Sequence, residues 1–155
     1  MIVKLYDNFT EREIEADIQE VEHQALKKID STRRFNFKWE EEGQHEVYLI
    51  RELNGSLPLG LMSFQGIPNE YRLHINLIES SKENVGKDKR YERVAGCLIA
   101  FAARLAFERK YDGFISLTPK SELIELYVAK YGFKKIGRQL AVFGPDALKI
   151  IDKYL

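Results

Sequence analysis

Two groups of residues in the second half of the chain have types and spacing suited to chemistry. The first is the run Arg90, Tyr91, Glu92, Arg93, Val94, Ala95 and Gly96, which leads into a long apolar segment. A helix that begins there would offer unpaired N–H groups and the positive end of its dipole, which suit a phosphate. The second is Tyr127, which precedes the pair Gly132-Phe133. A tyrosine hydroxyl held on a helix suits proton donation.

Basic residues gather around the first group. Residues 80–93 contain five basic residues and three acidic ones, whereas the whole chain has 24 of each sign. The basic residues are Lys82, Lys87, Lys89, Arg90 and Arg93. A solvated loop of mixed charge is the alternative that charge alone favours. Ala95 and Gly96 would let a ligand approach the backbone, or let the helix pack closely on a sheet.

Tyr127 also has two interpretations. Leu123, Ile124 and Leu126 surround it in the sequence, which is typical of an amphipathic core tyrosine whose hydroxyl reaches the surface. The chemical interpretation is a proton donor to a leaving thiolate. Because the ordinary pKa is about 10 for tyrosine and about 8.5 for a thiol, that transfer would be slightly uphill without tuning.

Length and composition limit the class of protein. With 155 residues, 45% hydrophobic and 31% charged, we expect one globular domain, 1–155. The balanced charge argues against non-specific nucleic-acid binding. Cys97 is the only cysteine, so an internal disulfide is excluded, and its apolar surroundings make it an improbable nucleophile. The histidines are scattered, and no metal-ligand spacing is present. We expect no membrane span, and a cytoplasmic location.

The first half of the chain predicts a strand, one or two helices and a meander. Residues 2–6 suit a strand. Thr10 and Glu13 form a capping box before a helical stripe at Ile14, Ile18, Val21, Ala25 and Ile29. The nearby acidic residues would form the wet face of that helix, with attraction of a cationic amine as the alternative; they are Glu11, Glu13, Glu15, Asp17 and Glu20. A short second helix is expected around 35–39. Strands are expected at 46–53 and 59–65, joined at Asn54-Gly55, and at 71–79.

The second half predicts alternating helices and strands. A helix is expected over 90–110, and then a strand over 113–117 that pairs in parallel after the crossover. A helix would begin at Thr118-Pro119 and end at Gly132. A strand over 133–143 and a helix over 145–155 follow. The fold class is therefore α/β (α+β), a mixed sheet with helices on both faces, and not a doubly wound fold.

Residues 71–143 resemble the GNAT acetyltransferase superfamily. Its loop pattern is Arg or Gln, two residues, Gly, one residue, and Gly or Ala. Arg90 and Ala95 match the first and last positions, and Arg93 stands where the pattern has glycine. Tyr127 matches the family's tyrosine before a Gly-Phe pair. The resemblance implies a mostly antiparallel central sheet whose central parallel strands, 71–79 and 113–117, splay apart.

The resemblance also implies a co-substrate, acetyl-CoA, between the splayed strands. Its pyrophosphate would bind the N–H groups from Tyr91 to Gly96. The cofactor-binding residues implied are Leu77, Ile78, Glu79, Arg90, Tyr91, Glu92, Arg93, Val94, Ala95 and Gly96.

The implied function is N-acetylation of an amine by direct transfer in a ternary complex. Tyr127 would protonate the thiolate of coenzyme A. Glu79 is the first candidate for the general base, with a solvent-facing strand end as the alternative. His74 is the second, with a sheet histidine as the alternative. The acceptor would be chosen by the first helix and by residues 31–44, and its identity stays open.

Two other hypotheses remain at this point. The replacement at Arg93 and the lack of an unmistakable base also suit a non-catalytic acyl-CoA-binding module. A structural α/β domain with no cofactor is the third. The expected partners are acetyl-CoA and an amine, without nucleic acid or membrane. Pairing of edge strands near the C-terminus would form a homodimer, a state that the sequence leaves open.

Overall fold

A computed structural model describes residues 1–155. The strands are β1 (Ile2–Asp7), β2 (Arg12–Glu20), β3 (Glu46–Glu52), β4 (Gly60–Ile67), β5 (Arg72–Ser80), β6 (Tyr91–Glu92), β7 (Ile115–Leu117), β8 (Lys134–Ile136) and β9 (Gln139–Val142). The α-helices are α1 (Leu26–Ser31), α2 (Val94–Glu108), α3 (Ile124–Tyr131) and α4 (Gly144–Tyr154). Short 3₁₀ turns are η1 (His23–Ala25), η2 (Trp39–Glu42), η3 (Pro68–Glu70), η4 (Lys82–Asn84) and η5 (Ser121–Leu123).

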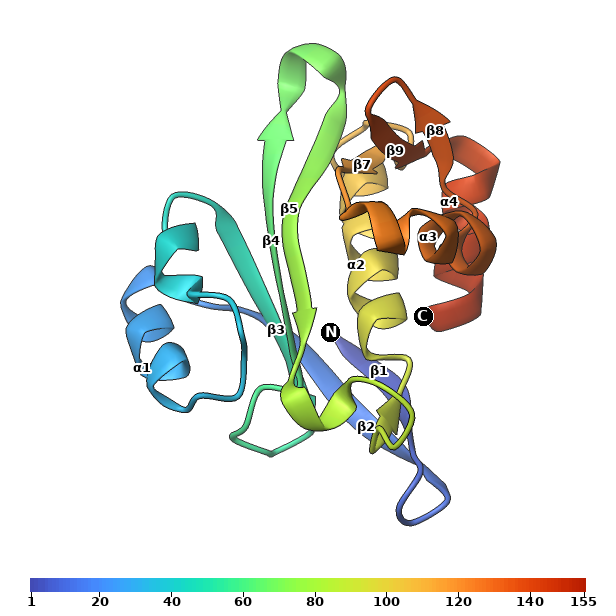
Figure 1. Cartoon of the computed structure of the whole chain (residues 1–155). Coiled ribbons are helices and arrows are strands. Elements are labelled where there is room, and N and C mark those ends of the chain that lie inside the picture. Colours follow the sequence, from blue (N-terminus) through green and yellow to red (C-terminus); the bar gives the residue numbers. More distant parts are fainter. The chain divides into compact units, whose positions relative to one another are not determined.

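The strands pair in the order β6-β1-β2-β3-β4-β5-β7-β9-β8. β5 and β7 are parallel, and the pairs β1–β2, β2–β3, β7–β9 and β8–β9 are antiparallel. The mixed, mostly antiparallel sheet is therefore confirmed. The chain divides into two compact units, residues 1–63 with 77–98 and residues 64–76 with 99–155, which are described separately (Figure 1).

In the first unit, the helix expected after Thr10 is wrong, because residues 12–20 form β2. Ile14 and Ile18 are four residues apart, which suits a helix, but Ala16 between them completes an alternation with period 2. β2 pairs with β1 on one side and β3 on the other, and buries Ala16 and Ile18. The two ladders and this burial favour the strand over the local helical signal. The acidic residues lie on the exposed side of β2, where Glu13 is 3.7 Å from Lys4.

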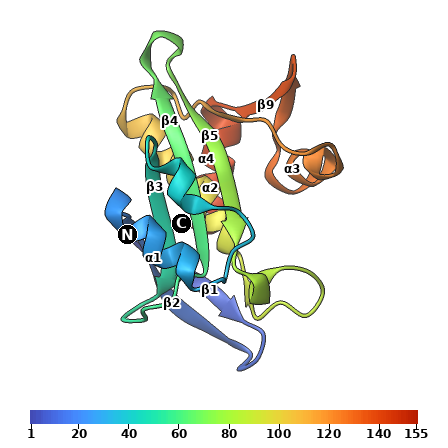
Figure 2. The same ribbon diagram turned by 60° about the vertical axis from the view of Figure 1, so that its left-hand side comes forward.

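The second expected helix, around 35–39, is also wrong. Trp39 begins the 3₁₀ turn η2, and the preceding residues form a loop. Figures 1 and 2 show α1 beside β3, and the core there joins Leu26 and Trp39 to Val47 of β3 and Leu61 of β4. The Asp30 carboxylate accepts the N–H groups of Trp39 and Glu40 at 2.8 and 2.9 Å. These tertiary contacts decide the loop's shape.

The helix expected from residue 90 begins later, at Val94. Tyr91 and Glu92 pair instead with Asp7 and Tyr6 of β1 as β6. Asn8 secures this connection, because its N–H donates to the Arg90 carbonyl at 2.7 Å and its amide donates to the Lys89 carbonyl at 2.9 Å.

In the second unit, β5 and β7 form the expected parallel pair, from Leu73–Ile115 to Ile75–Leu117. β5 then continues to Ser80, beyond the end of the ladder. The single strand expected over 133–143 is a hairpin, β8 and β9, which turns near Gly137. The expected helix end at Gly132 and the closing helix α4 are confirmed.

No helix of the chain is both long and apolar enough to cross a membrane.

Candidate functional site

The N-terminus of α2 follows a residue with an unusual backbone. Arg93 has φ 80°, and its carbonyl accepts the first helical hydrogen bond, from the Cys97 N–H at 2.9 Å. A non-glycine residue in this left-handed region is strained by about 1–3 kcal/mol. Arg93 stands where the GNAT loop pattern has glycine. Its backbone has a positive φ, which glycine would accommodate without strain. Its Nε donates to the Lys4 carbonyl at 3.2 Å.

The N–H groups of Val94, Ala95 and Gly96 lie in the first turn of α2, where a helix has no internal acceptor for them. Val94 packs tightly, since a Cβ on Gly60 would lie 2.6 Å from its Cγ1. The Tyr91 N–H, in contrast to these first-turn N–H groups, already has an acceptor, because it donates to Asn84 Oδ1 at 3.0 Å. In this structure the backbone donors available to an anion therefore come from the helix itself and not from Tyr91.

Arg90, the first residue of the pattern, binds a carboxylate of its own chain. Its Nε and Nη2 donate to the two Asp7 oxygens at 3.3 and 3.2 Å, and its guanidinium lies over the Phe9 and Tyr91 rings. Burial opposes the charge of Asp7, but the hydrogen bonds from Arg90 and from the Phe9 N–H outweigh it and lower the pKa of Asp7. Arg90 thus anchors the loop to the β1–β2 hairpin.

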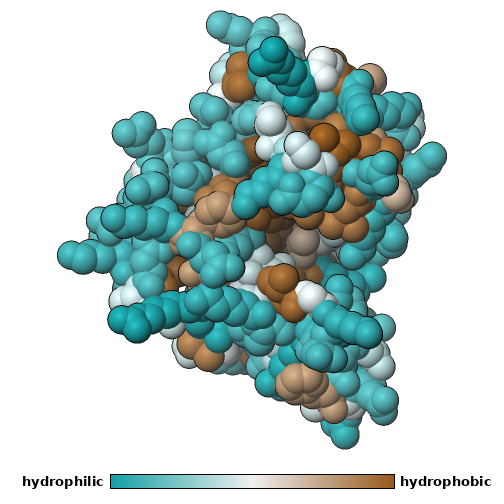
Figure 3. All heavy atoms as spheres, viewed as in Figure 1, coloured by the Kyte–Doolittle hydropathy of each residue, from teal (hydrophilic) through white to brown (hydrophobic).

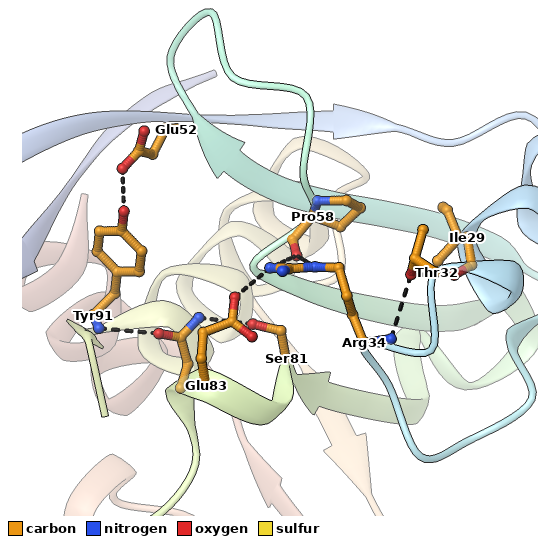
Figure 4. A network of polar contacts seen from close by, with 9 residues as sticks. Ile29, Thr32, Arg34, Glu52, Pro58, Ser81, Glu83 and Tyr91 are labelled. Carbon is orange, nitrogen blue, oxygen red and sulfur yellow. Dashed lines mark hydrogen bonds and ion pairs between the residues drawn. The ribbon is translucent and has the colours of Figure 1, made fainter. Parts of the chain in front are cut away.

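A polar network holds the rest of this loop (Figure 4). The Tyr91 hydroxyl donates to Glu52, and burial, followed by this carboxylate, raises the pKa of Tyr91. Arg34 donates to the Pro58 carbonyl at 2.9 Å and forms an ion pair with Glu83. These groups border a cavity of about 510 Å³. The segment before α2 is consequently positioned by specific contacts with residues from other parts of the first unit.

Glu79, the first candidate base, is engaged by three donors. Its carboxylate accepts the N–H groups of Asn36 at 2.6 Å and Phe37 at 3.2 Å, and the Trp39 indole N–H at 2.9 Å. These bonds hold residues 36–39 against the end of β5. Glu79 therefore positions that loop, a role that the sequence does not reveal because its partners lie about 40 residues away.

His74, the second candidate, belongs to a polar cluster in the second unit. Its Nδ1 lies 2.8 Å from Ser116 Oγ and 3.2 Å from Arg72 Nη1. Because a guanidinium can only donate, Nδ1 must accept, and the imidazole carries its proton on Nε2. Burial, followed by the Arg72 charge, lowers the pKa of His74. The ring is therefore neutral, and its second nitrogen is a hydrogen-bond donor.

Arg72 is the centre of this cluster and was missed in the sequence. Its Nη1 donates to Ser116 Oγ at 2.6 Å and to Gln139 Oε1 at 3.2 Å, and its Nη2 pairs with Glu70 at 2.9 Å. A cavity of about 320 Å³ adjoins it. The only sequence signal was the alternation of Arg72 and His74 with buried Leu73 and Ile75 along β5.

Tyr127 lies on α3 and is 8% exposed. Its ring packs against Tyr131 and Phe133, each at a centroid distance of 5.7 Å, and burial raises its pKa. Leu123, Leu126 and other apolar residues of the same segment are exposed, and apolar side chains gather over α3 and β8 on the right of Figure 3. The ring is therefore part of the core, as the structural interpretation predicted, and α3 also presents an uncovered apolar surface.

Cys97 is buried in α2, and burial raises the pKa of its thiol to about 11. A thiol with that pKa is almost entirely protonated at neutral pH, so it is a poor nucleophile. This agrees with the view of Cys97 as a packing residue.

Replacing Arg93 by glycine is expected to stabilise the protein. The change removes the left-handed strain, and we expect this gain to exceed the loss of the guanidinium's contacts, which include the Lys4 carbonyl and Cys97, so the free energy of unfolding should rise by about 1 kcal/mol. Arg93→Ala is the matched control, because it removes the same guanidinium and keeps the Cβ that causes the strain. Urea denaturation measures both. Equal stability of the two variants would show that the backbone of residue 93 stores no strain.

No protein-family model matches this sequence, and a search of curated proteins finds no match. Solved structures do match. A mutant form of the spermidine/spermine N-acetyltransferase SpeG from Vibrio cholerae has a TM-score of 0.60 at 13% identity, over 86% of this chain and 96% of that one. Nourseothricin acetyltransferase has a TM-score of 0.53 at 18% identity, and the matched region covers 64% of this chain and 65% of that one.

A third structure, AtaT complexed with acetyl-methionyl-tRNAfMet, has a TM-score of 0.56 at 11% identity, over 88% of this chain and 99% of that one. At these identities the likeness establishes the fold. The chain has the GNAT fold, which confirms the fold that the resemblance of residues 71–143 implied. AtaT is bound to RNA, so the expectation that this chain has no nucleic-acid partner rests on its balanced charge alone.

Proposed function

We propose that this protein is an N-acetyltransferase that moves an acetyl group from acetyl-CoA to an amine. The observation that carries the proposal is the backbone of Arg93. Residue 93 keeps the left-handed conformation immediately before α2 although its side chain is not glycine. A strained conformation is retained where the surrounding structure requires it, often at a functional site. Here it leads the chain into the helix whose first turn would bind the pyrophosphate.

The groups of this chain fit such a ligand. The first-turn N–H groups of α2 have no helical acceptor and lie at the positive end of a 15-residue helix. Lys87 is exposed in the preceding loop, where it would add attraction for phosphate. Of the other cofactor contacts implied by the resemblance, we retain Leu77 and Ile78, near the C-terminal end of β5. We assign two residues to holding the loop: Arg90, which binds Asp7, and Glu92, whose carboxylate accepts a hydrogen bond from the Asn8 amide at 3.2 Å.

In the proposed reaction, the amine nitrogen forms a bond to the acetyl carbonyl carbon and the carbon–sulfur bond breaks. Holding both substrates in one complex supplies much of the rate. A backbone N–H at the end of β5 would stabilise the oxyanion. The Tyr127 hydroxyl would donate its proton to the departing thiolate. Because burial raises the pKa of Tyr127, this hydroxyl stays protonated at neutral and mildly alkaline pH. The same shift makes proton transfer to the thiolate more uphill than for an ordinary tyrosine, so the proposal requires that the bound substrates lower this pKa or that the thiolate is protonated as the carbon–sulfur bond breaks.

The proton of the attacking amine is proposed to leave to water, and the phenolate left on Tyr127 takes a proton back from water, so that each turnover restores the donor. Glu79 accepts three hydrogen bonds, and the unprotonated nitrogen of His74, Nδ1, already contacts Arg72 and Ser116, so each of the two candidate bases already has another role. We therefore propose Glu79 as a positioning residue. The same two observations favour the second candidate function, a non-catalytic acyl-CoA-binding module, which needs no base.

Thermal unfolding with and without acetyl-CoA tests the proposal. A ligand at about 100 times its dissociation constant adds about 2.7 kcal/mol of stability, so we expect a clear upward shift in Tm. Release of free thiol with a broad panel of amines then separates the enzyme from the binding module. A shift without thiol release would favour the module, and no shift at millimolar acetyl-CoA would contradict both.

A further inference from the structure

A second cavity in the first unit has a marked excess of positive charge. Its volume is about 340 Å³, and it is lined by Arg33, Lys38 and Lys82 together with Phe35, Phe37 and Asp30. The cavity follows α1 and is made mainly by the loop that Figure 2 shows between α1 and η2. The chain as a whole has equal numbers of acidic and basic residues, so the excess is local.

The three cationic side chains are free of ion pairs, and each is exposed. The carboxylates near them are engaged elsewhere. Asp30 accepts the N–H groups of Trp39 and Glu40, and Glu83 pairs with Arg34.

Glu79, close in sequence to Lys82, binds the N–H groups of Asn36 and Phe37. An anion entering the cavity would therefore meet three cations that have no ion-pair partner, against the single carboxylate of Asp30 in the lining, so the lining keeps a net positive charge.

The backbone of Arg33 supports a binding role. Arg33 has φ 57°, directly after the C-cap of α1, and its N–H donates to the Asp30 carbonyl at 3.1 Å. Glycine is the residue usually found at this left-handed position, so an arginine there is kept at a cost in stability. Arg33 lines the basic cavity, whereas Arg34 turns toward Pro58 and Glu83 (Figure 4).

The cavity is also held in shape by hydrogen bonds. The Lys82 N–H donates to the Arg34 carbonyl at 2.9 Å, which joins η4 to the loop after α1. Glu79 and Asp30 secure the N–H groups on the opposite part of the loop. A cavity that is already ordered loses little entropy on binding a ligand.

We propose that this cavity binds an anionic group of the acceptor, so that the substrate is an amine that also carries a carboxylate or a phosphate. The proposal rests on the acetyltransferase function and names the class of its acceptor. Phe35 and Phe37 would contact the apolar part of the same molecule. A polyamine, the kind of molecule that the SpeG structure's name gives as its substrate, would be repelled by the three cations.

Two panels of amines test the inference, the free amino acids and the matching amino acid amides, which differ only in the carboxylate. Phosphoserine and phosphoethanolamine supply the phosphate arm. Binding is followed by NMR titration without acetyl-CoA, and turnover by thiol release with it. We expect amines with an anionic group to bind at least about tenfold more tightly than their neutral counterparts, as hydrogen bonds to a charged group predict. The anionic group, carboxylate or phosphate, that gives the larger gain in affinity is the one that the cavity binds.

Arg33→Gly removes one cation at a position where glycine is unstrained, so the variant should fold. It is expected to reduce the preference for anionic amines about tenfold. Lys110→Gly is the matched control, because Lys110 is also an exposed cation with positive φ, 66°, and it does not line the cavity. Lys82→Gln removes a second cation of the cavity without a change of backbone type.

Equal binding of acids and amides would overturn the inference. The inference would also be overturned if Arg33→Gly kept the wild-type preference for anionic amines. If Arg33→Gly weakened only acetyl-CoA binding, the cations would be assigned to the co-substrate, and the inference would again be overturned. Failure of the acetyltransferase proposal is distinct, because it would abolish thiol release with every amine and leave the NMR preference for anionic amines in place.

Discussion

Replacing Tyr127 by phenylalanine is expected to lower kcat for acetyl transfer by about 10²-fold, the lower range for loss of a general acid. Acetyl-CoA binding should be retained, because the ring can keep its contacts with Tyr131 and Phe133. Steady-state thiol release measures kcat, and the Tm shift caused by acetyl-CoA measures binding. A loss of turnover with unchanged binding would separate a chemical role from a packing role.

Tyr131→Phe is the matched control for this experiment. Tyr131 lies one turn further along α3, is equally buried, and its ring also packs against Tyr127. Its hydroxyl has no proposed role in the reaction, so the control should keep most of the wild-type kcat. Equal losses in the two variants would assign the effect to packing of the helix.

The raised pKa of Tyr127 predicts how the rate of acetyl transfer depends on pH. Burial moves this pKa above its ordinary value of about 10, so the proton donor remains protonated between about pH 7 and 9. The wild-type rate should therefore not fall over that range through ionisation of Tyr127. A fall that disappears in Tyr127→Phe would show that Tyr127 ionises in this range, and would contradict the raised pKa.

Glu79→Gln is expected to lower the free energy of unfolding by about 2 kcal/mol. Glutamine keeps the size of the side chain but replaces one acceptor oxygen with an NH₂ group. That group would face an N–H of residues 36 or 37, or the Trp39 indole N–H, and at least one donor would lose its partner. Urea denaturation measures the change, and we also expect the KM for the amine to rise.

Glu41→Gln serves as the control for Glu79→Gln, because Glu41 is an exposed carboxylate of η2 in the same region. It should leave stability unchanged. If Glu79→Gln instead unfolded like the wild type and lost kcat, Glu79 would be the general base that the sequence first suggested, and its role in holding the loop would be secondary.

Elements with strong local signals were predicted correctly. The α2 segment is a long apolar stretch, Gly132 follows the last turn of α3, and the strands at 46–52, 60–67 and 72–80 alternate or are flanked by turn residues. These features depend on neighbours in the sequence, through helical periodicity, capping and turn chemistry. Tyr127 and the segment before α2 could be identified for the same reason, because their motifs are local.

Segments with two compatible periodicities could not be decided locally. Residues 12–20 carry a helical spacing and an alternating one, and pairing with β1 and β3 selected the strand. The 133–143 segment reads as one strand, and the turn near Gly137 divides it into a hairpin. In both cases the hydrogen bonds that favour the observed structure come from another strand, which periodicity within the segment does not contain.

The sequence by itself determined the mixed α/β fold class, the parallel pair of β5 with β7, and the two segments that carry the candidate chemistry. Only the tertiary structure decided what the charged residues do. Arg90 binds Asp7, 83 residues away, and Glu79 binds the N–H of Asn36, 43 residues away. A charged side chain is matched by whichever donor or acceptor the fold brings within hydrogen-bond distance, and that proximity depends on the packing of distant segments rather than on spacing along the chain.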